Sequence, residues 1–353
     1  MTTPPNQSRI MVTGAAGYIG SHACLRLLET GYDVIAIDNL TRGHQGAIDN
    51  LSRLAPSGST FEFVEASIAD RDRMTQVLRD YDIGVVMHFA AFAYVGESVQ
   101  EPLRYYENNT AGACRLLQAM TEAKTPRFVF SSTCATYGEP PDTQIPIRET
   151  CPQSPINPYG WSKLMVEHIL RDHANACRES GLPFGYAALR YFNVAGSDPQ
   201  TRIGEDHRPE THLIPICLEV AAGRRPELTI FGEDYATEDG TCIRDYVHVM
   251  DLIDAHISVM NALESGSEFH FNVGLGHGYS VQEVLEACRR VTGQDIPAKL
   301  GPRRAGDPPR LFADPTKIRE TLGWTPRYTD LEETVETAWR WMKANPTGYP
   351  DEA

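Results

Sequence analysis

The chain has 353 residues, a length that suits two domains or one large α/β unit with an appended lobe. Hydrophobic residues make up 41% of it and charged residues 22%, and this apolar content excludes disorder along the whole chain. The formal net charge is −15. Duplex nucleic acid and anionic membranes bind proteins through positively charged surfaces, so we expect neither as the main partner of this acidic chain.

Cysteine and histidine spacing gives no sign of a disulfide framework or a metal site. The eight cysteines are widely spread and form no CxxC pair, which is typical of reduced thiols in a cytoplasmic protein. The first ten residues do not read as a signal peptide, and no apolar run is long enough to span a membrane. His207 and His212 are five residues apart, off a common helical face, so we expect no close pair of ligands and no bound metal.

The first forty residues predict a strand, a glycine turn, a helix and a second strand. The strands are residues 9–12 and 34–37, the turn is 13–20, and the helix is 21–30. The turn lets a pyrophosphate approach the backbone, and the helix N-terminus offers free N–H groups to that anion. Asp38, at the end of the second strand, would accept hydrogen bonds from the adenosine ribose hydroxyls, and its negative charge would repel a 2′-phosphate. These features predict NAD rather than NADP or an ordinary βαβ turn.

Arg42 is the one signal against this cofactor, because an arginine after the second strand can favour NADP. Further strands are predicted at residues 61–64, 85–91 and 127–132, separated by helical stretches. This alternation predicts a parallel, doubly wound sheet. Ligands bind beyond the carboxyl ends of such strands, where residues 89–91 and 131–133 are expected to lie.

A tyrosine and a lysine four residues apart, Tyr159 and Lys163, share one face of a helix predicted over residues 162–171. Tyrosine is a poor base at its free pKa of about 10, and lowering it to about 7 requires roughly 4 kcal/mol. A nearby ammonium and a cationic nicotinamide ring both favour the phenolate. Thr133, at the end of the preceding strand, would hydrogen-bond the reacting hydroxyl or carbonyl.

The glycine turn, Thr133 and the Tyr159/Lys163 pair resemble the extended short-chain dehydrogenase/reductases. Almost the whole chain is similar to the UDP-glucose (UDP-galactose) 4-epimerase family within that group. The segments that carry the resemblance are residues 95–99, 105–109, 190–193, 204–206, 212–215, 239–249 and 303–307. The match over 239–249 is too long to arise by chance.

The resemblance implies an α/β fold, with a Rossmann-like doubly wound parallel sheet and a smaller C-terminal α/β substrate lobe. It places an NAD-binding domain at residues 1–195 and a UDP-sugar-binding domain at 196–353, with a partial return to the first domain around 240–275. The implied catalytic residues are Thr133, Tyr159 and Lys163. The implied cofactor-binding residues are Gly14, Gly17, Tyr18, Ile19, Gly20, Asp38, Asn39, Leu40, Ser67, Ile68, Phe89, Ala90, Ala91, Asn108, Tyr159, Lys163 and Phe192. The implied substrate-binding residues are Thr133, Asn193, His212, Leu213, Arg244, Arg304, Asp307 and Leu311.

Four positions bear on this transfer of roles. Ser67 stands where the family usually has aspartate, and Ala93 stands where many relatives have a lysine near the cofactor. Arg244 lies in an otherwise apolar run, so its guanidinium needs an anion, either a ligand diphosphate or the adjacent Asp245. Leu311 stands at a sugar-pocket position where a small residue leaves room for an N-acetyl group.

The implied activity is NAD-dependent interconversion of UDP-glucose and UDP-galactose through a transient 4-keto sugar, by a cytoplasmic homodimer in galactose metabolism. An epimerase for UDP-N-acetylglucosamine or for UDP-xylose and UDP-arabinose would use the same chemistry. A dehydratase or decarboxylase would have acidic residues where this chain has Cys134 and Ala135. A non-catalytic dinucleotide sensor on the same fold is the third alternative, although such proteins tend to lose the Tyr159/Lys163 pair.

Overall fold

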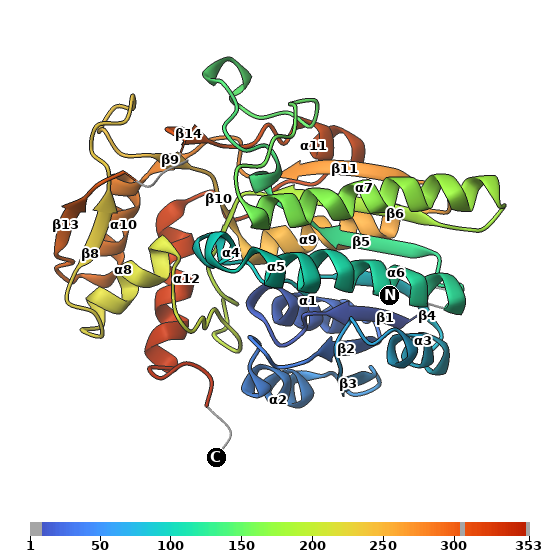
Figure 1. Cartoon of the computed structure of the whole chain (residues 1–353). Coiled ribbons are helices and arrows are strands. Elements are labelled where there is room, and N and C mark those ends of the chain that lie inside the picture. Colours follow the sequence, from blue (N-terminus) through green and yellow to red (C-terminus); the bar gives the residue numbers. More distant parts are fainter. Residues whose placement is uncertain (1–8, 304–307, 351–353) are drawn as a thin grey trace.

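Seven parallel strands form the main sheet of the computed structural model, which describes residues 9–303 and 308–350 (Figure 1). Their order in space is β11-β6-β5-β4-β1-β2-β3, and every neighbouring pair is parallel. The strands are β1 (Arg9–Thr13), β2 (Val34–Asp38), β3 (Phe61–Glu65), β4 (Ile83–His88), β5 (Arg127–Ser131), β6 (Gly185–Tyr191) and β11 (Glu268–Val273). The predicted doubly wound sheet is therefore confirmed, and its strand order reverses between β1 and β4.

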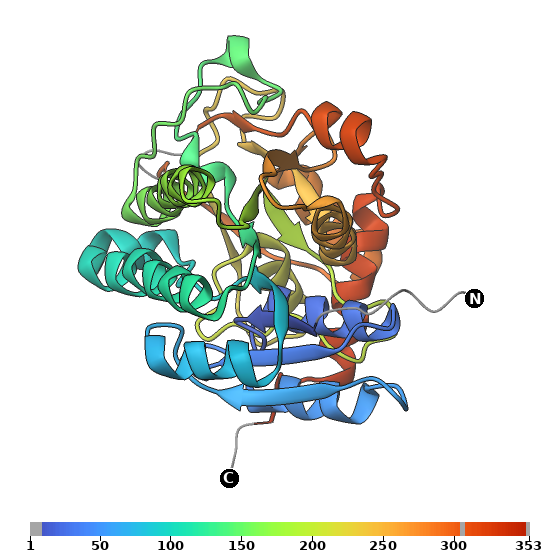
Figure 2. The ribbon, with the colours of Figure 1, turned by 90° about the vertical axis from the view of Figure 1, so that its right-hand side faces the viewer.

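Helices cover both faces of this sheet because successive strand residues point to opposite sides (Figure 2). On β1, Ile10 and Val12 join one apolar cluster, and Met11 between them joins the other. The first cluster is closed by α1 (Tyr18–Glu29), α2 (Gln45–Leu54), α9 (Val249–Ala262) and α11 (Thr316–Leu322). The second is closed by α3 (Arg71–Asp80), α6 (Gly112–Ala123) and α7 (Pro158–Glu179).

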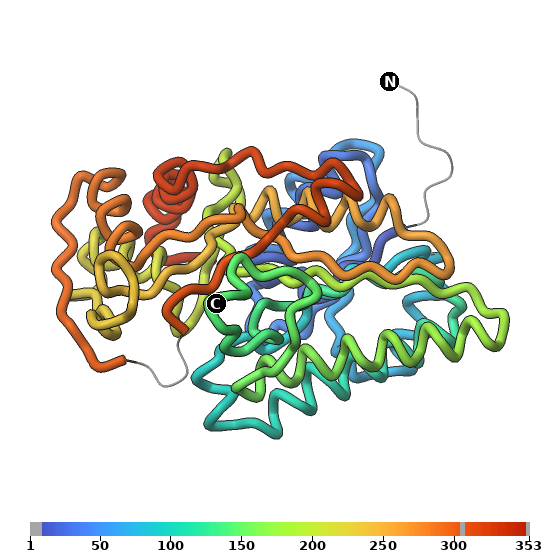
Figure 3. Tube along the Cα trace, turned by 90° about the horizontal axis from the view of Figure 1, so that it is seen from above, coloured from blue at the N-terminus to red at the C-terminus, as the bar shows by residue number. Residues whose placement is uncertain are grey.

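A smaller lobe lies beyond one end of the main sheet, on the left in Figures 1 and 3. Its apolar cluster gathers side chains from three helices and from one strand of a two-stranded parallel sheet. These elements are α8 (Leu213–Ala221), β8 (Leu228–Phe231), α10 (Val281–Thr292), β13 (Ala298–Gly301) and α12 (Leu331–Ala344). In α10, Ser280 and Glu283 form a capping box and Gly293 ends the helix in the left-handed conformation.

Short elements connect the two parts. They are α4 (Val95–Gln100), α5 (Pro102–Tyr105), a π-helical turn (Tyr106–Ala111), two short 3₁₀ turns (Cys134–Thr136 and Asp142–Gln144), β7 (Asn193–Ala195), β9 (Ile243–Arg244), β10 (Tyr246–His248), β12 (Tyr279–Ser280) and β14 (Arg310–Leu311). β7 pairs with β10, and β9 pairs with both β12 and β14. The chain then re-enters the main sheet through α9 and β11. The division at residue 195 remains a proposal.

Two predicted elements have observed bounds that matter for the site. The helix predicted over 162–171 is α7, which runs over Pro158–Glu179, so Tyr159 lies inside its first turn. β4 ends at His88, and residues 89–91 leave the sheet at its carboxyl edge.

All eight cysteines fall within the described part of the chain and are free thiols. Within the same part, no helix combines the length and apolar character needed to cross a membrane.

Candidate active site

The backbone geometry of the turn between β1 and α1 requires glycine at two of its positions. Gly14 has φ +73°, and a Cβ there would lie 2.6 Å from the backbone nitrogen of Ala90. A Cβ on Gly20 would lie 2.0 Å from the carbonyl oxygen of Gly14. A Cβ on Gly17 would meet only that oxygen, at 3.4 Å, so the protein itself can accommodate a side chain there. The free space beside Gly17 suits close approach of a pyrophosphate.

Asp38 fixes this turn against the end of β2. One carboxylate oxygen accepts from the backbone N–H of Ala16 at 3.0 Å, and the other accepts from Leu40 at 2.8 Å. Burial raises the pKa of Asp38, whereas the hydrogen bonds from Leu40 and Ala16 oppose that rise. Each carboxylate oxygen can accept a second bond, so the ribose contact predicted for Asp38 remains available.

A cleft runs from the glycine turn along the carboxyl ends of β2 and β4. The predicted cofactor residues that line it are Gly14, Gly17, Asp38, Asn39, Ile68, Phe89, Ala90, Ala91 and Asn108. The N-terminus of α1 faces this turn and has no acidic side chain in its first turn, so nothing there repels an anion. The donor turn, the acidic residue at β2 and the apolar wall of residues 89–91 together fit a bound NAD.

Four other predicted cofactor residues make contacts within the protein itself. The Tyr18 hydroxyl donates to the carbonyl of Gly196 at 2.5 Å and so ties the glycine turn to the segment after β7. Ile19 and Leu40 pack against the core. Ser67 Oγ accepts from the N–H of Ala69 at 3.2 Å, which is a local turn bond. The adenine contact predicted for Ser67 stays a prediction.

Arg42 lines the cleft, but its guanidinium is held by the protein. It forms an ion pair with Glu97 of α4, and it stacks over the rings of Phe92 and Tyr94 at 5.6 and 4.9 Å. This arrangement orients Arg42 toward α4 and weakens the signal for NADP. Sequence reasoning missed Phe92 and Glu97, although residues 95–99 carry part of the resemblance.

The predicted catalytic trio comes together at the carboxyl end of β5. Asn157 caps α7 by accepting from the N–H of Gly160 at 2.8 Å, which sets Tyr159 in the first helical turn. Lys163, one turn on, donates from Nζ to the carbonyl of Ser131 at 2.8 Å. Thr133, Tyr159 and Lys163 are all buried. The neighbouring strand β4 carries the cleft wall, so the trio lies beside the cofactor cleft.

Burial dominates the electrostatics of the trio. Burial raises the pKa of Tyr159 above its ordinary value, and a hydrogen bond from Thr133 opposes the rise. Burial also lowers the pKa of Lys163 to about 7. In the protein without its cofactor, the loss of solvation therefore outweighs any lowering of the phenol pKa by Lys163, whose ammonium is turned to Ser131. The expectation that Lys163 and the nicotinamide ring together favour the phenolate stays a prediction. The nicotinamide ring of a bound NAD would add a further positive charge beside the phenol.

A buried ionic network supports the trio from behind. Ser132 Oγ donates to Glu167 at 2.5 Å, and Glu167 forms an ion pair with Arg190 of β6 at 2.6 Å. Arg190 also donates to the hydroxyl of Tyr137 at 2.9 Å. These bonds fix the end of β5 against α7. Glu167 follows Lys163 by four residues, so the helical spacing that singled out Lys163 would also have found it.

Three of the predicted sugar-nucleotide residues lie at or beside β9. Arg244 stands opposite Leu311 in the β9–β14 pair, and its Nη1 donates to the carbonyls of Ile243 and Pro308 at 2.8 and 2.9 Å. Leu311 packs in the cluster that contains Phe192. The backbone N–H of Asn193 donates to the carbonyl of Asp245 at 2.9 Å. Arg304 and Asp307 lie outside the described residues.

Asp245, the competing anion for Arg244, is satisfied by backbone groups. Its carboxylate accepts from the N–H groups of Leu275, Gly276 and Ala313 at 2.8, 3.3 and 3.1 Å. Burial raises the pKa of Asp245 to about 6, and these three bonds oppose the rise. This aspartate therefore serves to join β9 to the segments around it.

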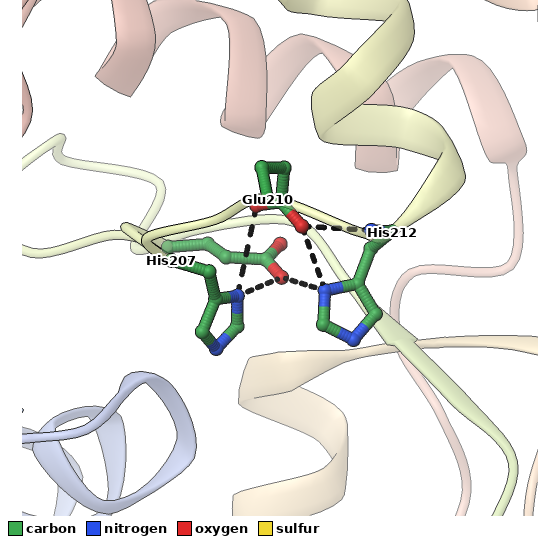
Figure 4. A group of neighbouring side chains, drawn as sticks. His207, Glu210 and His212 are labelled. Carbon is green, nitrogen blue, oxygen red and sulfur yellow. Dashed lines mark hydrogen bonds and ion pairs between the residues drawn. The ribbon is translucent and has the colours of Figure 1, made fainter. Parts of the chain in front are cut away.

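The two histidines at 207 and 212 do converge, so the expectation of no close pair is wrong (Figure 4). Their ring centroids are 4.9 Å apart, with Glu205 and Glu210 between them. Helical spacing does not apply, because residues 204–212 form a loop that leads into α8 at Leu213. Burial lowers the pKa of His207 and His212, but hydrogen bonds to the glutamates outweigh it and raise the values to about 9 and about 10.

Comparison with known proteins gives a consistent result. The model of the GDP-mannose 4,6 dehydratase family matches residues 11–338. A UDP-glucose 4-epimerase of Lacticaseibacillus casei is 50% identical over 343 residues, which cover 97% of this chain and 99% of that protein.

Two solved structures have the same fold. UDP-glucose 4-epimerase from Bifidobacterium longum, in complex with NAD+ and UDP, has a TM-score of 0.90 and 36% identity, covering 97% of this chain and 100% of that one. The UDP-Glc/GlcNAc 4-epimerase of Campylobacter jejuni has a TM-score of 0.80 and 43% identity, covering 96% and 100%.

Proposed function

We propose, since this chain belongs to the UDP-glucose 4-epimerase branch of the GDP-mannose 4,6 dehydratase family, that it interconverts UDP-glucose and UDP-galactose with bound NAD. The observation that carries the proposal is the burial of Thr133, Tyr159 and Lys163 together, beside a cleft that fits the dinucleotide. The first part of the chain, to about residue 195, holds NAD. Residues 196–353 hold most of the UDP-sugar.

Each member of the trio has a distinct task in this reaction. A NAD held in the cleft by Gly14, Asp38 and residues 89–91 would supply the hydride acceptor and donor for C4 of the sugar. Tyr159 Oη takes the proton of the C4 hydroxyl and later returns it. Thr133 hydrogen-bonds the same sugar oxygen, and Lys163 places positive charge close to the phenol. The 4-keto sugar turns within the pocket between the two hydrogen transfers, so C4 is inverted.

The pocket also has to hold the diphosphate while the sugar turns. Arg244 is the described residue best suited to this, because a guanidinium can bind phosphate oxygens through two parallel hydrogen bonds. His212 and Leu213 at the start of α8, together with Asn193 after β6, complete the described side of the pocket. The sugar then faces Phe192 and Leu311.

The direct test is incubation of the purified protein with UDP-galactose, without added nucleotide, followed by chromatographic separation of the epimers. We expect UDP-glucose to form up to a constant ratio, and the same ratio when the reaction starts from UDP-glucose. Failure to convert either sugar, with the bound nucleotide intact, would contradict the proposed function.

The range of sugars that the pocket accepts depends on Leu311. A bulky residue such as tyrosine at this position would fill the space that an N-acetyl group needs, whereas leucine is smaller and has no hydroxyl that requires a hydrogen bond. An apolar pocket rejects a modestly altered substrate by only about 1–3 kcal/mol, so we expect measurable epimerisation of UDP-N-acetylglucosamine. Leu311→Tyr should abolish that activity and spare the plain hexose. If both activities fall together, or the wild type never converts the N-acetyl sugar, Leu311 does not set the limit.

A homodimer is also part of the proposal. Large apolar side chains are exposed on three neighbouring helices, α4, α5 and α7, and these are Val95, Val99, Leu103, Trp161 and Met165. Leu103 is 80% exposed, and a two-fold dimer can cover the same patch on both subunits at once. The eight free thiols suit the cytoplasm, where the enzyme would serve galactose metabolism.

Replacing Leu103 by glutamate should break this dimer, because a charge at the centre of an apolar interface loses its hydration. Light scattering coupled to gel filtration should then report a monomer. Leu300→Glu, on β13 of the smaller lobe, is a matched control at a residue that is 57% exposed, and it should stay dimeric. A wild-type monomer, or a dimeric Leu103→Glu, would contradict the proposed interface.

A further inference from the structure

Two glutamates and two histidines of one loop point their side chains at a common centre (Figure 4). They occur as two Glu-x-His pairs, Glu205 with His207 and Glu210 with His212. Residues two apart in an extended segment point to the same side, which explains how each pair converges. One nitrogen or oxygen from each residue lies within 4.8 Å of the other three.

The printed separations between histidine nitrogens and glutamate oxygens are short enough for one cation to contact all four residues. Glu205 Oε1 lies 3.0 Å from Nδ1 of His207 and 3.1 Å from Nδ1 of His212. Glu210 lies 2.9 Å from Nδ1 of His212 through Oε1, and 3.6 Å from Nδ1 of His207 through Oε2. With zinc bonds of about 2.0–2.1 Å, tetrahedral ligand atoms stand about 3.3 Å apart. The four nitrogen–oxygen separations, 2.9–3.6 Å, lie close to this value.

The ring nitrogen of His207 that faces the cluster is enclosed between the two carboxylates. Nδ1 of His207 is shielded from solvent and has no aligned hydrogen-bond partner in the described part of the chain, although Glu205 lies 3.0 Å away. A shielded nitrogen that lies between two carboxylates without an aligned hydrogen bond is placed as a metal ligand would be, and an ion at the centre of the cluster would engage it directly.

The carboxylates are also held in place from outside the cluster. Glu210 Oε1 accepts from the backbone N–H groups of Thr211 and His212 at 2.6 and 2.7 Å. Such bonds orient a carboxylate ligand in the way that outer-shell partners do at metal sites. The side chains of Glu205 and Glu210 are only 6% exposed, so two negative charges need compensation here.

We propose that Glu205, His207, Glu210 and His212 bind one divalent transition-metal cation, with Zn²⁺ as the fitting ion. Imidazole nitrogen and carboxylate oxygen are both zinc ligands, and four of them make a closed, structural site. The cation cross-links the loop 204–212 just before α8 begins at Leu213. It also stiffens the loop where the ring of His207 lies against Tyr18 of the glycine turn and against Tyr94, at 6.1 and 6.0 Å.

Coordination would also fix the orientation of His212. With Nδ1 on the cation, its Nε2 carries the ring proton and becomes a donor. That this donor faces the sugar nucleotide rests on the proposed function, whereas cation binding itself does not. Without a cation, two protonated imidazoles would balance the two carboxylates, so only a metal measurement distinguishes the two states.

The experiment uses untagged full-length protein, treated with a chelator, reloaded with Zn²⁺ and passed through a metal-free gel-filtration column. We expect one zinc per chain by elemental analysis, and a Co²⁺-loaded sample with the strong visible absorption of four-coordinate cobalt. Zn²⁺ should also raise the thermal midpoint of the wild type. His207→Ala and the nearly isosteric Glu210→Gln should lose zinc and this shift, whereas His277→Ala, an exposed histidine outside the cluster, should keep both.

Retention below half an equivalent by the wild type, or equal retention by His207→Ala and Glu210→Gln, overturns the proposal. Circular dichroism and bound-nucleotide content show whether each variant is folded. If Glu210→Gln does not fold, the comparison of wild type with His207→Ala and His277→Ala still decides. A protein that binds zinc but does not convert UDP-galactose contradicts the proposed function and leaves the metal site standing.

Discussion

Replacing Tyr159 by phenylalanine should lower the turnover of UDP-galactose by at least about 10²–10⁴-fold, the usual contribution of a general acid–base group. The ring keeps its packing in the first turn of α7, and only the ionisable oxygen is lost. Steady-state kinetics give kcat, and extraction of the bound nucleotide should still yield one NAD per chain. The loss therefore belongs to proton transfer rather than to cofactor binding.

Tyr186→Phe is the matched control. Tyr186 is fully buried in β6, and its hydroxyl has no hydrogen-bond partner within the described residues, so its removal should leave turnover unchanged. Near-normal turnover in Tyr159→Phe would show that another group moves the proton. Recovery of NADP from either protein would show that Asp38 does not govern the cofactor and would return that role to Arg42.

Replacing Arg244 by alanine should weaken UDP-sugar binding by about 2–5 kcal/mol, the cost of removing one partner of a buried charge pair. That range corresponds to a loss of affinity of about 30-fold to several thousand-fold. UDP alone should lose affinity in parallel, because the contact is to the diphosphate. Calorimetric titration with UDP measures this loss, and kcat at saturating substrate should change much less.

Arg225→Ala is the control for this variant, since Arg225 pairs with Glu219 of α8 and lies at a partly exposed position. It should bind UDP as the wild type does. Unchanged UDP affinity in Arg244→Ala would assign the guanidinium to its bonds with the carbonyls of Ile243 and Pro308. The arginine would then act only in joining β9 to the chain that follows residue 307.

The parts of the fold that sequence predicted well depend on local spacing. The order strand, glycine turn, helix and strand follows from apolar runs and from glycines whose backbone allows no Cβ, as at Gly14. Tyr159 and Lys163 were found because four residues make one helical turn, and α7 does contain both. The carboxyl-edge position of residues 89–91 follows from the parallel topology alone.

The parts that sequence missed depend on contacts between distant segments. Arg42 meets Glu97 only because the chain brings α4 back over the cleft. The pKa of Tyr159 depends on how completely the folded protein removes water from it, which no spacing reveals. The convergence of His207 and His212 needs a loop conformation, whereas the sequence argument assumed a helix.

The most direct test of the central claim is the fate of the hydrogen at C4. UDP-galactose labelled with deuterium at C4 is incubated with the protein in ordinary water, and the UDP-glucose formed is analysed by mass spectrometry and NMR. We predict full retention of deuterium at C4, because the same hydrogen is removed and returned within one turnover while Tyr159 exchanges only the hydroxyl proton. Replacement of the label by solvent hydrogen would mean that C4 loses a proton instead, and would contradict the account.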